Sequence, residues 1–304
     1  MAFSIQLART AARDAVPFAR RLLGAAAEGI ESAWQRTVGQ EIEDRIAFLP
    51  GVRDAGADAF GLDLEWSKYA LSVVWMLHRK YFRTEVHGIE NVPSGRVLLI
   101  ANHSGQVPID GAMIGAALFF DAREPRIVRS MVEKWVQTLP FFAVLFTRMG
   151  QVVGVPENAR RLLENGEAIL VFPEGSRGIS KPFTQRYQLT EFGLGFLRLA
   201  LETNTPIVPI AVVGAEEQYI NLANLTGVAK ALGMPTFPVV PQFVIPGLQM
   251  PLPTKYRVYF GEPLRFDGDP DDDDAVIEEK VWVVKQTIQS MLNRGLKERR
   301  GIFF

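Results

Sequence analysis

From about residue 83 onward, short apolar runs bounded by glycine and proline alternate with patterns typical of helices, and this alternation constrains the fold most strongly. The predicted strands span residues 96–101, 168–172, 207–213 and 256–260, and the predicted helices span 110–120, 158–165, 189–203 and 275–299. Strands that alternate with helices indicate an α/β fold. We therefore expect a largely parallel central sheet flanked by helices.

The preceding residues, 1–82, read as amphipathic and helical. Residues 1–27 are rich in arginine and alanine and contain one acid, Asp14. This pattern fits a helix on a membrane surface, although a helix packed on the core or a mitochondrial transit peptide fits the composition as well. Residues 66–82 predict an aromatic-rich helix. We expect a membrane-association region over 1–82 and an α/β domain with a closing helix over 83–304.

Composition excludes several classes of protein. Hydrophobic residues make up 48% of the chain and charged residues 22%, as in folded globular proteins. The net charge of −1 gives no basic field for nucleic acid. There is no cysteine and the three histidines lie far apart, so we expect no metal site. No apolar run reaches the roughly 20 residues of a membrane span, so we expect a peripheral protein on the cytoplasmic face of a membrane.

His103 directly follows the predicted strand at 96–101, with Asp110 at the start of the next predicted helix. Ligands of open α/β sheets bind beyond the carboxyl ends of strands. A carboxylate on one imidazole nitrogen fixes the tautomer, so that the other nitrogen can accept a proton. His103 and Asp110 are therefore the predicted base and its orienting acid.

Two further segments follow the same logic. Pro173-Glu-Gly-Ser-Arg-Gly178 comes after the strand at 168–172, and an arginine there suits a phosphate or carboxylate. The strand at 207–213 contains Pro209 and is preceded by Pro206, which predicts an edge strand or a bulge that walls an apolar pocket.

A protein nucleophile is missing from these motifs. Cysteine is absent, and Glu174-Gly-Ser-Arg-Gly178 has glutamate where the serine-hydrolase motif GxSxG begins with glycine. A base without its own nucleophile can activate a substrate hydroxyl, which then attacks an acyl thioester directly.

Asn102-His103 with Asp110, then Phe172-Pro-Glu-Gly-Ser-Arg177, then Ile207-Val-Pro-Ile210, in this order and about 70 and 35 residues apart, resemble the PlsC-type glycerolipid acyltransferase superfamily. The resemblance covers roughly residues 85–265. It implies transfer of a fatty acyl group from acyl-CoA or acyl-carrier protein to a lipid hydroxyl, with no cofactor. It assigns catalysis to His103 and Asp110. The residues it implies for substrate binding are Asn102, Ser104, Gly105, Glu174, Gly175, Ser176, Arg177 and Pro209.

The chain departs from the family pattern at two points. Six residues separate His103 from Asp110 instead of the usual four, and position 108 is Pro108. The apolar run after Gly150 lacks the arginine that contacts an acceptor phosphate. Both departures favour the mono- and diacylglycerol acyltransferase-like branch, which acylates neutral or long-chain alcohols. A lysophospholipid or lysophosphatidic acid acceptor is the alternative. Candidates for binding donor phosphates are Arg126, Arg129 and Lys134.

Two other classes of function stay open. The altered spacing would suit a lipid-binding protein that has lost catalysis, and a histidine base could activate water in a thioesterase or lipid hydrolase. The expected partners are a lipid acceptor, an acyl thioester and a membrane surface, with acyl-carrier protein as a possible donor and no nucleic acid. The C-terminal Ile302-Phe-Phe304 fits either a surface anchor or a packing contact.

Overall fold

The computed structural model describes residues 38–49, 56–104, 107–138, 141–231, 237–245 and 249–304. The chain divides into two compact units, Met1–Ala47 and Phe48–Phe304. The helix described in the first unit is α2 (Gln40–Ala47), and the amphipathic pattern expected over 1–27 lies outside the described residues. This division falls earlier in the chain than the boundary expected after residue 82.

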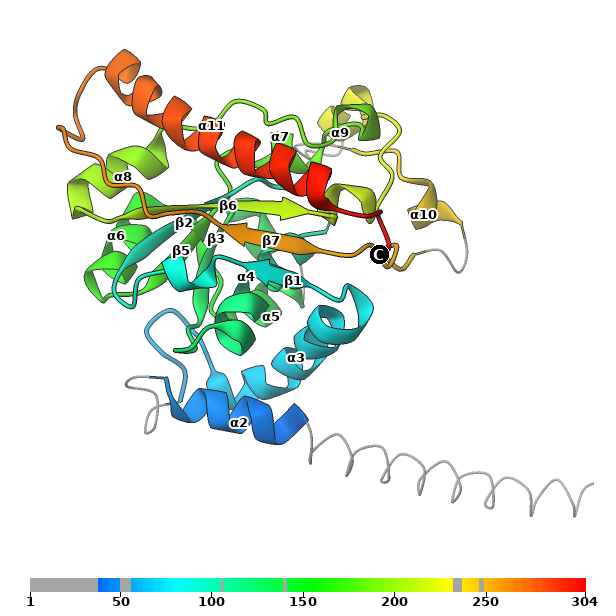
Figure 1. Ribbon diagram of the computed structural model, residues 1–304, viewed down its shortest axis with the longest axis horizontal. Helices are drawn as coiled ribbons and strands as arrows, with labels where there is room; N and C mark the ends of the chain where they lie inside the picture. The colour runs from blue at the N-terminus through cyan, green and yellow to red at the C-terminus, as the bar shows by residue number, and fades with distance from the viewer. Residues whose placement is uncertain (1–37, 50–55, 105–106, 139–140, 232–236, 246–248) are drawn as a thin grey trace, which may run out of the picture. The chain divides into compact units, whose positions relative to one another are not determined.

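The second unit is built on a seven-stranded sheet (Figure 1). Its strands are β1 (Glu85–His87), β2 (Val97–Ala101), β3 (Val128–Val132), β4 (Val152–Val153), β5 (Ala168–Val171), β6 (Ile207–Val213) and β7 (Arg257–Phe260). Their order across the sheet is β1-β7-β6-β2-β5-β3-β4. The five strands from β6 to β4 run parallel, whereas β7 pairs antiparallel with β6 and parallel with β1. The predicted α/β class with a largely parallel sheet is confirmed.

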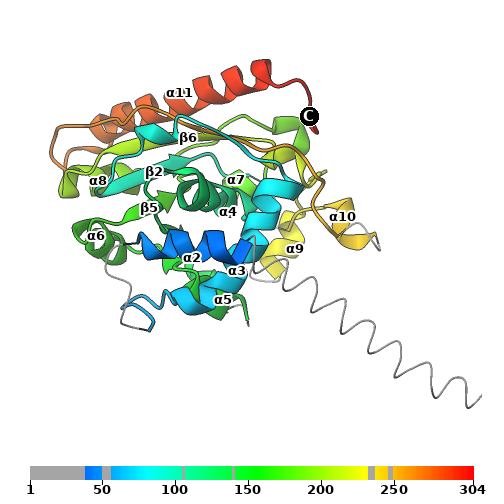
Figure 2. The same cartoon turned by 60° about the horizontal axis from the view of Figure 1, so that its bottom comes forward.

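Helices cover both faces of this sheet. The α-helices are α3 (Leu64–Met76), α4 (Ile109–Ala116), α5 (Phe142–Arg148), α6 (Pro156–Glu164), α7 (Ser176–Ile179), α8 (Gly195–Thr203), α9 (Thr226–Ala231), α10 (Pro241–Val244) and α11 (Asp274–Glu298). Shorter 3-10 or π turns are η2 (Leu77–Tyr81), η3 (Ile89–Asn91), η4 (Ala117–Asp121), η5 (Lys134–Thr138), η6 (Phe183–Gln185) and η7 (Ala215–Glu217). Figures 1 and 2 show α11 and α8 on one side of the sheet and α3, α4 and α5 on the other.

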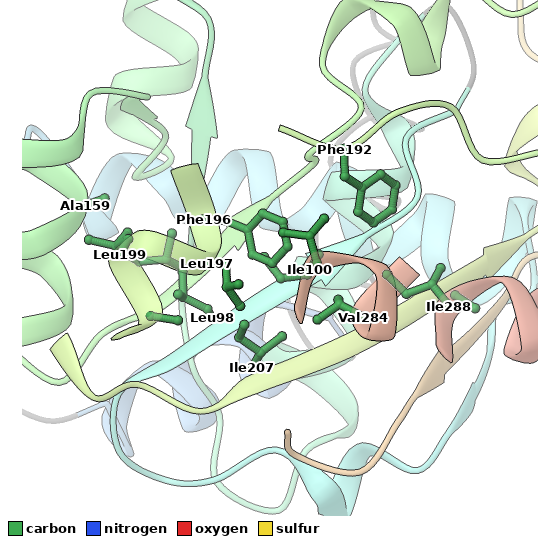
Figure 3. Packing of buried hydrophobic residues seen from close by; sticks show 14 of the residues in the cluster. Leu98, Ile100, Ala159, Phe192, Phe196, Leu197, Leu199, Ile207, Val284 and Ile288 are labelled. Carbon is green, nitrogen blue, oxygen red and sulfur yellow. The ribbon is translucent and has the colours of Figure 1, made fainter. Parts of the chain in front are cut away.

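The main core lies between the sheet and helices α6, α8 and α11. Leu98 and Ile100 of β2 point into it and meet side chains of α8 and α11 such as Leu197 and Val284 (Figure 3). All five residues of β2 are buried. A strand covered on both faces needs apolar side chains at every position, which explains why β2 reads as a continuous apolar run.

The expectation that prolines put the 207–213 strand at an edge is wrong, because β6 lies inside the sheet between β7 and β2. Gly261 donates its N–H to the Pro209 carbonyl over 2.8 Å, so these two residues form a hydrogen-bonded antiparallel pair. The N–H that proline lacks would point at Gly261, one residue beyond the end of β7. The pairing resumes at the Ile207–Leu264 bridge, two residues before Pro209 on one strand and three residues after Gly261 on the other. This one-residue offset is a β-bulge, the other alternative that the prolines predicted.

None of the helices within the described residues combines the length and the apolar character needed to cross a membrane. The helix predicted over 66–82 is observed as α3 and η2, and it packs against α4 and α5 within the second unit.

Candidate active site

Three neighbouring strands of the sheet end at the same edge and carry the polar residues of the candidate site. β6, β2 and β5 are adjacent and parallel, so their carboxyl ends lie together. His103 follows β2, Glu174 follows β5, and Glu216 follows β6. This edge is where ligands of open α/β sheets bind.

His103 and Asp110 form a hydrogen-bonded pair despite the six residues between them. His103 Nδ1 lies 2.8 Å from Asp110 Oδ2. The Asp110 carboxylate is fully buried, and it also accepts the backbone N–H groups of Ser104 at 2.9 Å and Gly111 at 2.8 Å. These donors fix the acid in the first turn of α4. Nδ1 is therefore the nitrogen that carries the proton toward Asp110, and Nε2 is the nitrogen left to act as a base.

Two further contacts hold His103, one to its ring and one to its backbone. The Phe172 ring stacks on the His103 ring with centroids 4.0 Å apart and an interplanar angle of 17°. Glu174 Oε1 accepts the backbone N–H of His103 at 3.0 Å, and Glu174 Oε2 accepts both the N–H and the hydroxyl of Thr190. Sequence reasoning quoted Phe172 and Glu174 in a motif, but it did not predict these contacts with the histidine.

Helix α7 lies directly against the histidine. A Cβ added at Gly178 would come within 3.0 Å of His103 Cβ and 2.9 Å of Glu174 Cβ, so no larger residue fits without a shift. Gly175, just before α7, has φ of 55° and ψ of −147°, a conformation that only glycine adopts readily. The two glycines let the turn after β5 approach the loop after β2.

A buried charge cluster lies behind this turn. Lys181 Nζ lies 3.4 Å from Glu174 Oε2 and 3.1 Å from Glu216 Oε1, and it donates to the Gln188 carbonyl at 3.2 Å. Burial raises the pKa of the Glu216 carboxyl to about 7, against the opposing effect of the Lys181 ammonium. Sequence reasoning missed Lys181 and Glu216 as site residues. The two residues are 35 positions apart in the sequence, and only the fold brings their side chains together.

Asn102 and Ser104, both expected to bind substrate, are fully buried. Both polar atoms of the buried Asn102 side chain bond to Val212: Asn102 Nδ2 donates to the Val212 carbonyl at 3.2 Å, and Asn102 Oδ1 accepts the Val212 N–H at 2.8 Å. The side chain thus joins the ends of β2 and β6. The Ser104 hydroxyl has no hydrogen-bond partner among the residues that the structure describes. Gly105 lies outside the described residues.

The residues of the Gly175–Arg177 turn are also engaged. The Gly175 N–H donates to the Phe172 carbonyl at 3.0 Å, and the Ser176 N–H donates to Glu133 Oε1 at 3.1 Å. The exposed Arg177 guanidinium pairs with Glu191 at 3.1 Å. The backbone N–H of Gly175 is therefore not a free donor for an oxyanion.

Pro209, expected to wall a pocket, lies away from the dyad. Its ring and the Met291 sulfur of α11 both lie against Gly261. This contact puts the proline on the face of the sheet that α11 covers.

Two of the three expected donor-phosphate ligands are committed elsewhere. Arg126 donates to the carbonyls of Pro93 and Gly166, which precede β2 and β5 and so lie at the opposite edge of the sheet from the dyad. Arg129 is fully buried and pairs with Asp58 at 2.7 Å. Lys134 begins η5 just after β3, is exposed, and remains a candidate.

Comparison with known proteins defines the class to which this fold and site belong. The family model described as Acyltransferase matches residues 83–213, which contain β2, β5, β6 and the dyad. An uncharacterized protein of Mycobacterium leprae is 36% identical over 293 residues, which cover 91% of this chain and 80% of that protein. The chain belongs to the PlsC-type acyltransferase family.

More distant relatives agree with this assignment. The mouse protein named DGAT1/2-independent enzyme synthesizing storage lipids is 24% identical over 210 residues, which cover 69% of this chain and 60% of that protein. Among solved structures, the 1-acyl-sn-glycerophosphate acyltransferase PlsC from Thermotoga maritima superposes with a TM-score of 0.50 at 18% identity. The match covers 78% of this chain and 83% of the PlsC chain, and it supports the same fold.

Proposed function

We propose that this protein transfers a fatty acyl group from an acyl thioester, either acyl-CoA or acyl-carrier protein, to the hydroxyl of a lipid. The observation that carries the proposal is the 2.8 Å contact between His103 Nδ1 and the buried Asp110 carboxylate at the carboxyl ends of the parallel strands. The membership of the chain in a family of glycerolipid acyltransferases agrees with this chemistry.

The dyad acts without a covalent enzyme intermediate. His103 Nε2 takes the proton of the acceptor hydroxyl, and the oxygen attacks the thioester carbonyl carbon to give a tetrahedral oxyanion. The C–S bond then breaks, the ester forms, and the imidazolium returns the proton to the leaving thiolate. The Asp110 carboxylate stabilises the imidazolium between the two proton transfers.

A neutral acceptor, such as a mono- or diacylglycerol or a long-chain alcohol, fits the charges around the dyad better than a phosphate. Arg177 is paired with Glu191, while Arg126 and Arg129 make their contacts away from the strand ends that carry the dyad. The similarity to the storage-lipid enzymes points in the same direction. A lysophospholipid acceptor is the second candidate, since the exposed Arg177–Glu191 pair is weak enough for a phosphate to displace Glu191.

The test measures thiol release from long-chain acyl-CoA, and from acyl-carrier protein, with lysophosphatidic acid, monoacylglycerol, diacylglycerol and a long-chain alcohol as acceptors. We expect an ester product with the neutral acceptors and a loss of about 10² to 10⁴-fold in turnover for His103→Ala. His87→Ala is the matched control, because His87 lies on β1 and stacks on Tyr259, away from the dyad. Free fatty acid as the sole product would indicate a hydrolase. Lipid binding without turnover would indicate a non-catalytic protein.

We propose in addition that the protein works at the cytoplasmic face of a membrane as a peripheral protein. Tyr69, Val73 and Met76 are exposed and recur every three or four residues, so they form one apolar stripe on α3. Val73→Glu should lower the fraction that floats with anionic liposomes. Val283→Glu, an exposed valine on α11 across the sheet, should leave flotation unchanged. Equal flotation of both variants and the wild type would remove this stripe from the proposal.

A further inference from the structure

Both oxygens of the Glu174 carboxylate accept hydrogen bonds, one of them from the loop that carries His103. Its Oε1 accepts the N–H of His103 at 3.0 Å, and its Oε2 accepts the N–H and the hydroxyl of Thr190 at 2.8 and 3.0 Å. The side chain is fully buried. In the resemblance to the family this glutamate belongs to an acceptor-binding block, yet here every contact that it makes is internal.

The cation that accompanies Glu174 is Lys181. Its side chain is 4% exposed, and its Nζ contacts Glu174 Oε2, Glu216 Oε1 and the Gln188 carbonyl at 3.1 to 3.4 Å. Glu174 follows β5, Gln188 lies in the loop before α8, and Glu216 follows β6, so one ammonium joins three separate segments. Within the described part of the chain, no hydrogen bond or ion pair joins Lys181 to the His103 ring or to Asp110.

We propose that Lys181 is a positioning residue, which holds the Glu174 carboxylate against the His103 N–H and thereby sets the orientation of the catalytic imidazole. The role in catalysis rests on the acyltransferase function proposed above. The physical reason is charge balance: Glu174 and Glu216 are two buried carboxylates that share one ammonium. Without the ammonium, like-charge repulsion and burial drive a proton onto the pair. A protonated Glu174 is a weaker acceptor for the His103 N–H.

The decisive variants are Lys181→Met, which keeps the length of the side chain without its charge, and the double variant Lys181→Met with Glu216→Gln. The single variant should lose at least about tenfold in kcat with KM for both substrates changed less than about threefold. The double variant removes one positive and one negative group, so the cluster keeps the net charge that it has in the wild type. Glu174 is then its one carboxylate, and the Thr190 and His103 donors remain. It should recover most of the lost kcat.

The pH profile separates positioning from a merely structural role. In Lys181→Met, Glu174 is faced by Glu216 and by the neutral donors of His103 and Thr190, so kcat should gain a limb that rises with pH as the shared proton leaves. The wild type keeps the Lys181 ammonium beside both carboxylates, so any such limb should lie at lower pH there. The double variant has one carboxylate and should lack the limb. Leu162→Ala, a core change in α6, is the control for loss of stability, and it should leave the profile unchanged.

A readout that needs no turnover keeps this inference separate from the proposed function. The chain has three histidines, so NMR can follow each imidazole. Lys181→Met should move the ring signals of His103 and leave those of His87 in place, and the double variant should bring the His103 signals back, even if no acyl acceptor is found. If the single variant does not fold, the double variant is compared with the wild type, and its His103 ring signals should match those of the wild type. Unmoved His103 signals together with wild-type kcat in Lys181→Met would overturn the proposal, as would a raised acceptor KM that the second change does not restore.

Discussion

Glu216 is a carboxyl group buried beside a lysine, and its ionisation links the stability of the protein to pH. Its pKa is about 7 in the folded chain, against an ordinary value of 4.5. Between these two values the folded state holds a proton that the unfolded state has released. The contribution of Glu216 to stability is therefore complete below pH 4.5 and is lost as the pH rises toward and through 7.

The prediction at this residue concerns Glu216→Gln, which cannot ionise. The unfolding free energy of the wild type, measured relative to this variant by urea denaturation, should fall as the pH rises from about 4.5 to 7. Amide and carboxyl groups can both accept the Tyr187 N–H that Glu216 Oε2 accepts at 2.9 Å, so the shape of the cluster is kept. A difference between the two proteins that does not vary with pH, or that grows with pH, would contradict the raised pKa.

The pairing of His103 with Asp110 could be predicted from the sequence, whereas the partners of the other charged side chains could not. His103 follows an apolar run and Asp110 follows it at short range, so the sequence alone indicates the pair. Arg129 looked like a free cation by the same reading, yet it is buried against Asp58, 71 residues earlier. Which charge meets which is decided by contacts between distant segments.

At the level of elements, the short helix α7 determines how closely the loop after β5 approaches His103. In Gly178→Ala the new Cβ would lie 3.0 Å from His103 Cβ and 2.9 Å from Glu174 Cβ, and the second separation is shorter than real Cβ contacts. We expect this change to lower kcat by about tenfold or more, since a shift of about 1 Å at a catalytic group costs on that order. Steady-state kinetics at saturating substrate measure it.

Gly115→Ala in α4 is the matched control for the glycine change. A Cβ at this position meets nothing within 4 Å, so kcat should stay at the wild-type value. Because alanine favours the helix over glycine by roughly 0.5–1 kcal/mol, stability should rise slightly. Equal loss of activity in both variants would show that the contact of α7 with His103 does not matter.

The elements that the sequence pattern missed are those with little apolar periodicity. β1 has three residues and β4 has two, which is too short for an alternating pattern. β3 carries the buried Arg129, a charge that argues against a buried strand until its partner Asp58 is known. The longer runs β2, β5, β6 and β7 and the helix α11 were predicted to within one or two residues.

For the molecule as a whole, residues 302–304 form hydrogen bonds with residues just before β1 and at the start of β7. The Ile302 carbonyl accepts the Lys255 N–H at 2.7 Å, and the carbonyls of Phe303 and Phe304 accept from Arg83 and Arg257. Of the two interpretations left open by the sequence, these backbone contacts support packing.

Deletion of residues 302–304 should therefore lower the free energy of unfolding by about 2 kcal/mol, at roughly 0.5–1.5 kcal/mol for each lost hydrogen bond. At an unfolding entropy of about 2.1 cal/mol/K per residue, this corresponds in a chain of 304 residues to a fall of about 3 °C in Tm, which calorimetry measures. Phe304→Ala keeps the carbonyls and removes a ring that is 77% exposed, so it should leave Tm nearly unchanged. An unchanged Tm in the deletion variant would mean that these contacts add nothing to stability.

The sequence by itself determined the α/β class, the order of the motifs and the candidate pair of His103 and Asp110, because each depends on neighbours within about ten residues or on the period of apolar side chains. The tertiary structure alone decided that Pro209 lies inside the sheet, that Asn102 joins β2 to β6, and that Lys181 supports Glu174 beneath the histidine. The first two facts depend on strands that are adjacent in space but distant in the chain. The physical reason is that burial and the sharing of one charge among several partners are properties of the packed sheet edge, and no local pattern records them.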